Sequence, residues 1–187
     1  MEKYLIVVDM QNDFVTGSLG TKEAVSIVSN VKNKLLQCIK DGYKIFFTQD
    51  THADNYMETH EGKFLPVKHC IYDSDGWQII PELKEIMPTI SRDCMTLYKA
   101  SFSIPTWDSY IYCRNKNVLV PEDFKGTIEI VGVCTDICVI SNAITIRSQL
   151  PNAEIIVHAD CCAGTTPERH KAALEVMKSC HITVIGE

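Results

Sequence analysis

Continuous apolar runs alternate along this chain with segments in which apolar residues recur at helical spacing. The runs predict strands covered on both faces of a sheet, and they lie at residues 5–8, 43–48, 127–133, 153–157 and 181–185, with a weaker one at 89–98. Helical patterns occupy residues 22–41, 105–113, 139–150 and 167–177. This alternation predicts an α/β fold: a three-layer α/β/α, Rossmann-like arrangement around a mainly parallel, six-stranded sheet.

Two segments follow neither pattern clearly. Residues 53–77 lack periodicity and are rich in His, Asp and Gly, which indicates a long surface loop of the kind that is often functional. Residues 77–87 predict a short helix that is interrupted by Pro81. Residues 117–125 connect into the central strand.

Composition narrows the class of protein. The chain has 187 residues, of which 45% are hydrophobic and 22% charged, and we expect one globular domain over residues 1–187. A net charge of -6 without a basic cluster gives no support to nucleic-acid binding. No apolar run reaches transmembrane length and no signal peptide is evident, so we expect a cytoplasmic protein that does not bind membranes. The nine cysteines are then mostly reduced core thiols.

Residues with useful chemistry follow several of the predicted strands. Asp9, Asp50, Lys99 and Asp160 lie at or just beyond strand ends, and Cys138 follows the strand over 127–133. In parallel sheets ligands bind outside the carboxyl ends of the strands. The sequence therefore predicts that these side chains surround one site.

Cys138 is the candidate nucleophile. Thr135 and Asp136 stand where a helix N-cap is expected, which puts Cys138 in the first helical turn, where backbone N–H groups favour the thiolate. A carboxylate such as Asp9 could take the thiol proton, and Lys99 could hold the thiolate. The alternative is a buried cysteine that acts only as a small hydrophobic residue.

A second group of residues could bind a metal. Asp50 and His52 are two positions apart on an extended segment and point the same way, and His69 could be a third ligand, with His60 as a competitor. Two imidazoles and a carboxylate suit a divalent zinc, iron or manganese ion. The alternative is a polar loop that happens to contain histidines.

Three motifs are spread along nearly the whole chain. The first is VVDMQNDF at residues 7–14, followed by GSL at residues 17–19. The second is GVCTDICV at residues 132–139, and the third, residues 160–173, reads DCCAGTTPERHKAA. In this order they resemble the opening motif, the nucleophile motif and the closing segment of the isochorismatase-like cysteine hydrolases.

The resemblance implies roles for individual residues. It implies a catalytic triad of Asp9, Lys99 and Cys138, and a cis peptide bond between Val133 and Cys134. The backbone N–H groups of Cys134 and Cys138 would form the oxyanion hole. Asp50, His52 and His69 resemble the metal site of the nicotinamidase branch, with zinc favoured. The implied substrate-binding positions are Phe14, Leu19 and Val133.

The function that the resemblance implies is hydrolysis of nicotinamide to nicotinate and ammonia through a thioester, by an enzyme that forms a homo-oligomer. Three features depart from the family pattern: no tryptophan precedes His69, the segment at residues 100–102 is short, and Asn142 stands where threonine is common. The first two line the substrate pocket, which keeps a related amidase of carbamoyl or ureido groups open. Two further hypotheses are a non-catalytic small-molecule binding module and a thiol-redox protein that uses Cys134 and Cys138.

Overall fold

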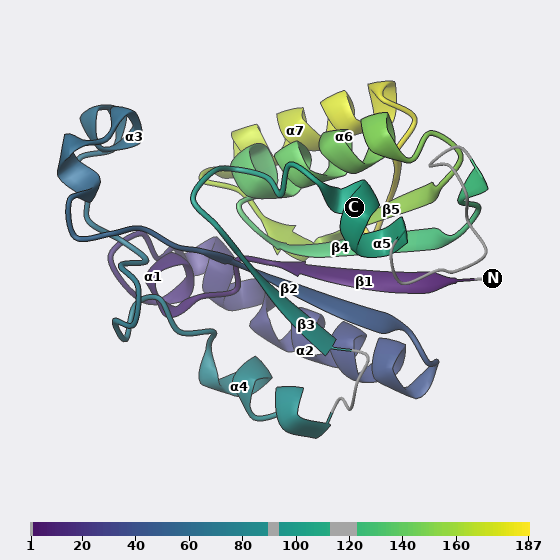
Figure 1. Ribbon diagram of the computed structural model, residues 1–187, viewed down its shortest axis with the longest axis horizontal. Helices are drawn as coiled ribbons and strands as arrows, with labels where there is room; N and C mark the ends of the chain where they lie inside the picture. The colour runs from purple at the N-terminus through teal and green to yellow at the C-terminus, as the bar shows by residue number, and fades with distance from the viewer. Residues whose placement is uncertain (1, 90–93, 113–122) are drawn as a thin grey trace.

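The computed structural model describes residues 2–89, 94–112 and 123–187, and a six-stranded, all-parallel sheet forms its centre. The strand order is β3-β2-β1-β4-β5-β6, so the direction in which the sheet grows reverses between β1 and β4. The strands are β1 (Lys3–Val8), β2 (Lys44–Asp50), β3 (Cys94–Lys99), β4 (Thr127–Val133), β5 (Glu154–Ala163) and β6 (Thr183–Ile185). The predicted α/β class and parallel sheet are confirmed (Figure 1).

Helices cover both faces of the sheet (Figure 1). The α-helices are α1 (Asn12–Val15), α2 (Lys22–Lys40), α3 (His60–Phe64), α4 (Pro81–Lys84), α5 (Trp107–Tyr112), α6 (Ile140–Gln149) and α7 (Pro167–Ser179). Helices α2 and α4 pack on one face, and α5, α6 and α7 on the other (Figure 1). Within the described ranges, no helix has both the length and the apolar character needed to cross a bilayer.

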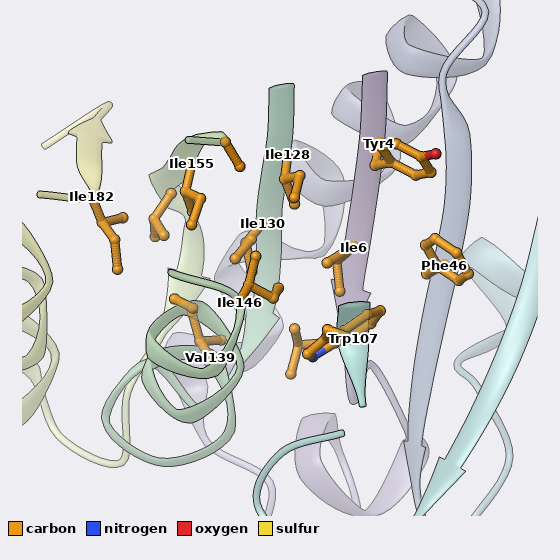
Figure 2. Close-up of a cluster of buried hydrophobic side chains, with 14 of the residues drawn as sticks. Tyr4, Ile6, Phe46, Trp107, Ile128, Ile130, Val139, Ile146, Ile155 and Ile182 are labelled. Atoms are coloured by element: carbon orange, nitrogen blue, oxygen red, sulfur yellow. The ribbon is translucent and has the colours of Figure 1, made fainter. Parts of the chain in front are cut away.

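The central strand β1 is buried on both faces, as its continuous apolar run predicts. Tyr4 and Ile6 point into the core beneath α5 and α6, whereas Leu5 and Val7 point toward α2. In the core beneath α5 and α6, the rings of Trp107 and Phe46 meet edge to face with their centroids 5.6 Å apart (Figure 2). Because side chains alternate along a strand, a run that is apolar at every position places hydrophobic side chains in both cores.

The longest helix, α2, begins and ends where its local sequence predicts. The Thr21 hydroxyl caps the first turn by accepting a hydrogen bond from the Ala24 backbone N–H at 3.0 Å. Gly42, with φ +73°, follows the end of the helix in the left-handed conformation that glycine adopts without steric penalty. The predicted apolar stripe faces the sheet, with Ala24, Ile27, Val31, Leu35 and Cys38 buried.

The loop predictions need correction. Residues 53–77 contain two short helical segments, η1 (Tyr56–Glu58) and α3, and Tyr56 and Trp77 are buried, so this segment is partly core. Pro81 starts α4 and does not interrupt it, because a proline at the first helical position gives up no intrahelical hydrogen bond. The predicted strand residues 90–93, the predicted helix end at Cys113 and the connector at 117–122 lie outside the described residues.

Glu129 places a carboxylate in the middle of β4, on the face that α2 covers. It forms ion pairs with Lys34 of α2 and His158 of β5, and its Oε1 accepts a hydrogen bond from the Tyr43 hydroxyl at 2.5 Å. Burial by itself raises the pKa of this carboxyl, but the hydrogen bonds from His158, Lys34 and Tyr43 outweigh it and lower the pKa to about 2. The charged form is therefore favoured in the folded state.

We expect Glu129→Gln to lower the free energy of unfolding at pH 7 by about 3 kcal/mol, since each pKa unit corresponds to about 1.4 kcal/mol. A depressed carboxyl pKa stabilises the fold above the unfolded-state pKa. The difference between wild type and variant is therefore full above about pH 4.5 and disappears as the pH falls toward about 2. Urea denaturation across this range measures it, with Glu154→Gln as an exposed carboxyl control on β5. An equal loss of unfolding free energy in Glu129→Gln and Glu154→Gln would contradict the prediction.

Candidate active site

The predicted site residues meet at the carboxyl edge of the sheet, around the point where the strand order reverses. Asp9 directly follows β1 with φ +47°, while Asp50 and Lys99 are the last residues of β2 and β3. Cys138 lies in a π-helical turn, η4 (Thr135–Val139), which joins β4 to α6. Asp160 does not belong to this site, because β5 continues past it to Ala163 and its side chain is exposed.

Lys99 lies at the centre of the buried charged group. Its Nζ is 2.7 Å from Asp9 Oδ2, 3.5 Å from Cys138 Sγ and 3.5 Å from Asp50 Oδ1. The other carboxylate oxygen of Asp9, Oδ1, accepts a hydrogen bond from the Thr48 hydroxyl at 2.6 Å. One ammonium group therefore contacts the thiol and both carboxylates, in surroundings from which water is largely excluded.

The electrostatics of the group differ from the prediction that the resting sulfur is ionised. Burial raises the pKa of the Cys138 thiol and the charge of Asp9 raises it further, while Lys99 opposes both effects. Burial also raises the pKa of Asp9, against the attraction of Lys99. The pKa of Lys99 is raised because Asp9, Cys138 and Asp50 outweigh its desolvation. These shifts favour the protonated thiol over the thiolate, so attack on a substrate requires a base that takes the thiol proton.

The turn that carries Cys138 is built differently from the predicted N-cap. Cys134 is the N-cap residue, and its carbonyl accepts hydrogen bonds from the N–H groups of Ile137 and Val139, each at 3.0 Å. Thr135 and Asp136 already lie inside the turn, so their prediction as cap residues is wrong. The peptide bond between Val133 and Cys134 is cis, as the family resemblance implies.

Asp50, His52 and His69 converge as predicted, and their ligand atoms all lie within 4.8 Å of one another. Asp50 Oδ2 is 2.9 Å from Nε2 of His52 and 3.4 Å from Nε2 of His69. The other ring nitrogen of His69, Nδ1, lies 2.8 Å from the Val67 carbonyl, which orients Nε2 toward the group. Buried nitrogen and carboxylate donors in this arrangement fit a divalent metal ion. His60 is exposed on α3 and its ring lies tilted against that of Phe64, so it does not join the group.

The sequence missed one acidic residue at this group. Glu61 Oε1 lies 3.9 Å from Nε2 of both His52 and His69, and Glu61 lines a cavity together with His69 and Cys138. The residue falls in a segment without periodicity, where only the folding of α3 brings it to the histidines. The hydrogen bond from the Gly62 N–H to the Thr59 hydroxyl, 3.0 Å long, caps this short helix.

Two residues of the opening motif hold the backbone at Asp50 and next to His69 in place. The Gln11 side chain donates to the Asp50 carbonyl at 2.9 Å and accepts from the Asp50 N–H at 2.7 Å, which fixes the backbone of that residue. Asp13 Oδ2 accepts a hydrogen bond from the N–H of Cys70, next to His69, at 2.8 Å. These contacts of the buried Gln11 amide and the half-buried Asp13 carboxylate were not predicted from the sequence.

A cavity of about 420 Å³ opens onto the Cys138 thiol. Phe14, Leu19 and Val133, the predicted substrate-binding residues, all line it, and the ring of Phe14 lies 5.5 Å from that of His69. Phe102 also lines it, in the segment 100–102 that was expected at the pocket, and Phe64, Ile137 and Arg169 are among the further lining residues. The lining is mostly apolar, and Cys138, Asp50 and His69 are among its buried residues.

Comparison with known proteins matches nearly the whole chain to one family. The family model described as the isochorismatase domain matches residues 3–186. A nicotinamidase from Saccharomyces cerevisiae is 23% identical over 220 residues, covering 99% of this chain and 100% of its own length. The crystal structure of a nicotinamidase from Bacillus subtilis is 25% identical, has a TM-score of 0.82 and matches 98% of this chain and 99% of its own. A pyrazinamidase of Pyrococcus horikoshii in complex with zinc is 26% identical, with a TM-score of 0.79 and full coverage of both chains.

Proposed function

The chain belongs to the isochorismatase family, and from that premise we propose that it is a cysteine-dependent nicotinamidase, which converts nicotinamide and water to nicotinate and ammonia. The observation that carries the proposal is the contact of Lys99 Nζ with both Asp9 and Cys138, next to an apolar cavity that Cys138 lines. The reaction is hydrolysis of an amide C–N bond.

In the first half of the reaction Asp9 is the general base. Its carboxylate takes the proton of the Cys138 thiol, and the thiolate attacks the amide carbon. Lys99 stabilises the thiolate as it forms, because its ammonium group is 3.5 Å from the sulfur. The C–N bond then breaks, and the protonated Asp9 gives its proton to the departing nitrogen, which leaves as ammonia. Asp9 is ionised again and Cys138 carries a thioester.

In the second half water hydrolyses the thioester. Asp9 takes a proton from the water as the oxygen attacks the acyl carbon, and the C–S bond breaks to release the acid. The sulfur recovers its proton from Asp9, which restores the starting state. The raised pKa of Asp9 suits this double role, because a carboxyl group with a pKa nearer to neutrality both accepts and returns a proton.

The backbone N–H groups of Cys134 and Cys138 are the proposed oxyanion hole. The cis bond before Cys134 and the turn that follows keep both residues at the end of β4, beside the cavity. Donors held in place by the backbone stabilise the negative charge that develops on the amide oxygen without having to reorganise.

Asp50, His52 and His69 would hold a divalent ion, with zinc favoured, and Glu61 is close enough to serve as a further ligand. When bound, the ion supplies a Lewis acid that can accept the pyridine nitrogen and so orient the ring. Phe14 packs beside His69 and would stack on that ring. This chain would thereby distinguish a pyridine carboxamide from an amide without a ring nitrogen.

Ammonia release from nicotinamide and from a panel of carbamoyl and ureido compounds tests the proposal, with metal-free and metal-reloaded protein side by side. Nicotinamide is expected to be the preferred substrate. Metal removal is expected to lower kcat/KM by at least about tenfold, and added Zn²⁺, Fe²⁺ or Mn²⁺ to restore it. His69→Ala should lose bound metal, whereas His60→Ala, on the exposed face of α3, should retain it. Turnover of ureido compounds alone would favour the related amidase, and no turnover of any amide would favour a binding module.

A further inference from the structure

Asn142 of α6 is a fully buried amide that joins two parts of the cavity wall. Its Nδ2 donates to the carbonyl of Cys138 at 2.7 Å and to the carbonyl of Phe102 at 3.2 Å. Its Oδ1 accepts hydrogen bonds from Ser103 Oγ at 3.2 Å, Ile104 N at 3.1 Å and Trp107 Nε1 at 2.8 Å. The orientation of the amide follows from its surroundings, since donors lie on one side and carbonyls on the other.

The partners of Asn142 show what it connects. Cys138 carries the thiol, four residues earlier on the same helical stretch. Phe102 lies three residues beyond Lys99, in the short segment that follows β3, and its side chain lines the cavity. Both segments bear groups that act on the substrate, and both are tied to this one amide.

We propose that Asn142 is a positioning residue for the hydrolysis, which holds the Phe102 wall of the cavity against the turn that carries Cys138. The inference deepens the proposed function and rests on it for the identity of the substrate. Asn142 does not contact the cavity itself; it acts through the Phe102 segment and through the Cys138 backbone. A buried amide with every donor and acceptor matched gives a fixed geometry, because any shift leaves a polar group unpaired.

Gln149, seven residues later on α6, provides a matched control. Its side chain donates to the Pro105 carbonyl at 2.6 Å and accepts from the Asp108 N–H at 3.1 Å, so it also ties α6 to the chain that follows β3. These contacts lie beyond the cavity wall and reach neither Cys138 nor Phe102. If Asn142 only tied α6 to the neighbouring chain, its replacement would affect KM and kcat no more than replacement of Gln149.

Two variants, Asn142→Thr and Asn142→Val, have side chains of the same shape. Together they separate the bond of Asn142 to Cys138 from its bonds to the segment after β3. In Asn142→Thr the hydroxyl can still donate to the carbonyl four residues earlier, that of Cys138, as threonine often does in helices. The bonds to Phe102 and Ile104 are lost, because the shorter side chain does not reach them. Asn142→Val has the same shape as the threonine variant without the hydroxyl and loses both sets of bonds.

We expect Asn142→Thr to raise KM for nicotinamide about tenfold with kcat within about twofold, because the wall moves while the nucleophile stays in place. Asn142→Val is expected to show the same rise in KM and in addition a fall in kcat of about fivefold or more. Gln149→Leu should leave both constants within about twofold of wild type. Equal effects at positions 142 and 149, or a wild-type KM in Asn142→Thr, would overturn the proposal.

A double-mutant cycle with Phe102→Ala tests whether Asn142 acts through this ring. If it does, Asn142→Thr combined with Phe102→Ala raises KM no further than Phe102→Ala alone. Additive increases in KM would show that Asn142 affects the substrate by another route and would contradict the inference. Ser103→Ala, which removes one donor to Asn142 Oδ1, replaces Asn142→Thr in the cycle if that variant does not fold.

Two measurements need no turnover and separate failure of this inference from failure of the proposed function. Hydrogen exchange at the Ile104 amide, which donates to Asn142 Oδ1, is expected to accelerate in both Asn142 variants but not in Gln149→Leu. The rate at which iodoacetamide alkylates Cys138 is expected to change in Asn142→Val more than in Asn142→Thr. An enzyme without amidase activity that shows both changes would refute the nicotinamidase proposal alone, and unchanged exchange and alkylation would refute the role of Asn142.

Discussion

Cys138→Ala is expected to lower kcat for nicotinamide by at least about 10⁴-fold while leaving the fold intact, because it removes the atom that forms the proposed thioester. The sulfur is buried and contacts Lys99, so its removal leaves a small cavity, while Lys99 keeps its contacts with Asp9 and Asp50. Steady-state ammonia release measures the loss. Mass spectrometry of wild type quenched during turnover should detect the acyl adduct on Cys138.

Asp9→Asn is the companion to this variant. If Asp9 works only through the Cys138 thiol and the leaving group, combining Cys138→Ala with Asp9→Asn is expected to lower kcat no further than the slower single variant does. The effects of residues that act as one unit are not additive. Cys38→Ala, which removes a buried thiol from α2, is the control for loss of a core cysteine and should keep wild-type kcat. Residual activity of Cys138→Ala above about a hundredth of wild type would exclude the nucleophile role.

Lys99→Met is expected to lower the free energy of unfolding by about 3–5 kcal/mol and kcat by at least about a hundredfold. The ammonium group compensates the buried carboxylates of Asp9 and Asp50, and its removal leaves both without their cation. Urea denaturation measures the stability. Lys44→Met is the control, because the ion pair of Lys44 with Glu2 is partly exposed and contributes no more than about 1 kcal/mol.

The pH dependence and a rescue variant identify the cause of this loss. Removing Lys99 takes away an interaction that lowers the pKa of Asp9, so that pKa rises further above its usual range. A carboxyl group whose pKa is raised by folding destabilises the fold where it must ionise, and the destabilisation declines as the pH falls. The stability gap between Lys99→Met and wild type should therefore narrow as the pH is lowered from 8. Adding Asp9→Asn to Lys99→Met should recover part of the stability at pH 8, and no recovery would contradict the electrostatic explanation.

Much of the fold could be predicted from the chain because strand and helix periodicities are local properties. The apolar run over 127–133 coincides with β4, and the stripe over 22–41 coincides with α2 to within a residue at its end. The motifs at 7–14 and 132–139 indicated the family that the domain match over residues 3–186 then showed. Residues that follow successive parallel strands are bound to meet at one edge of the sheet, so Asp9, Lys99 and Cys138 could be grouped from their positions in the sequence.

The tertiary structure decided the order of the strands and the electrostatics of the site. Burial together with the charge of Asp9 raises the pKa of the Cys138 thiol, which no property of the helix turn alone could predict. Glu61 and Asn142 acquire their partners only when α3 and the segment after β3 fold against the site. Local sequence determines which backbone conformation each segment prefers. Desolvation, charge coupling and long-range hydrogen bonds depend on segments that are distant in sequence, and they arise only once the sheet has brought those segments together.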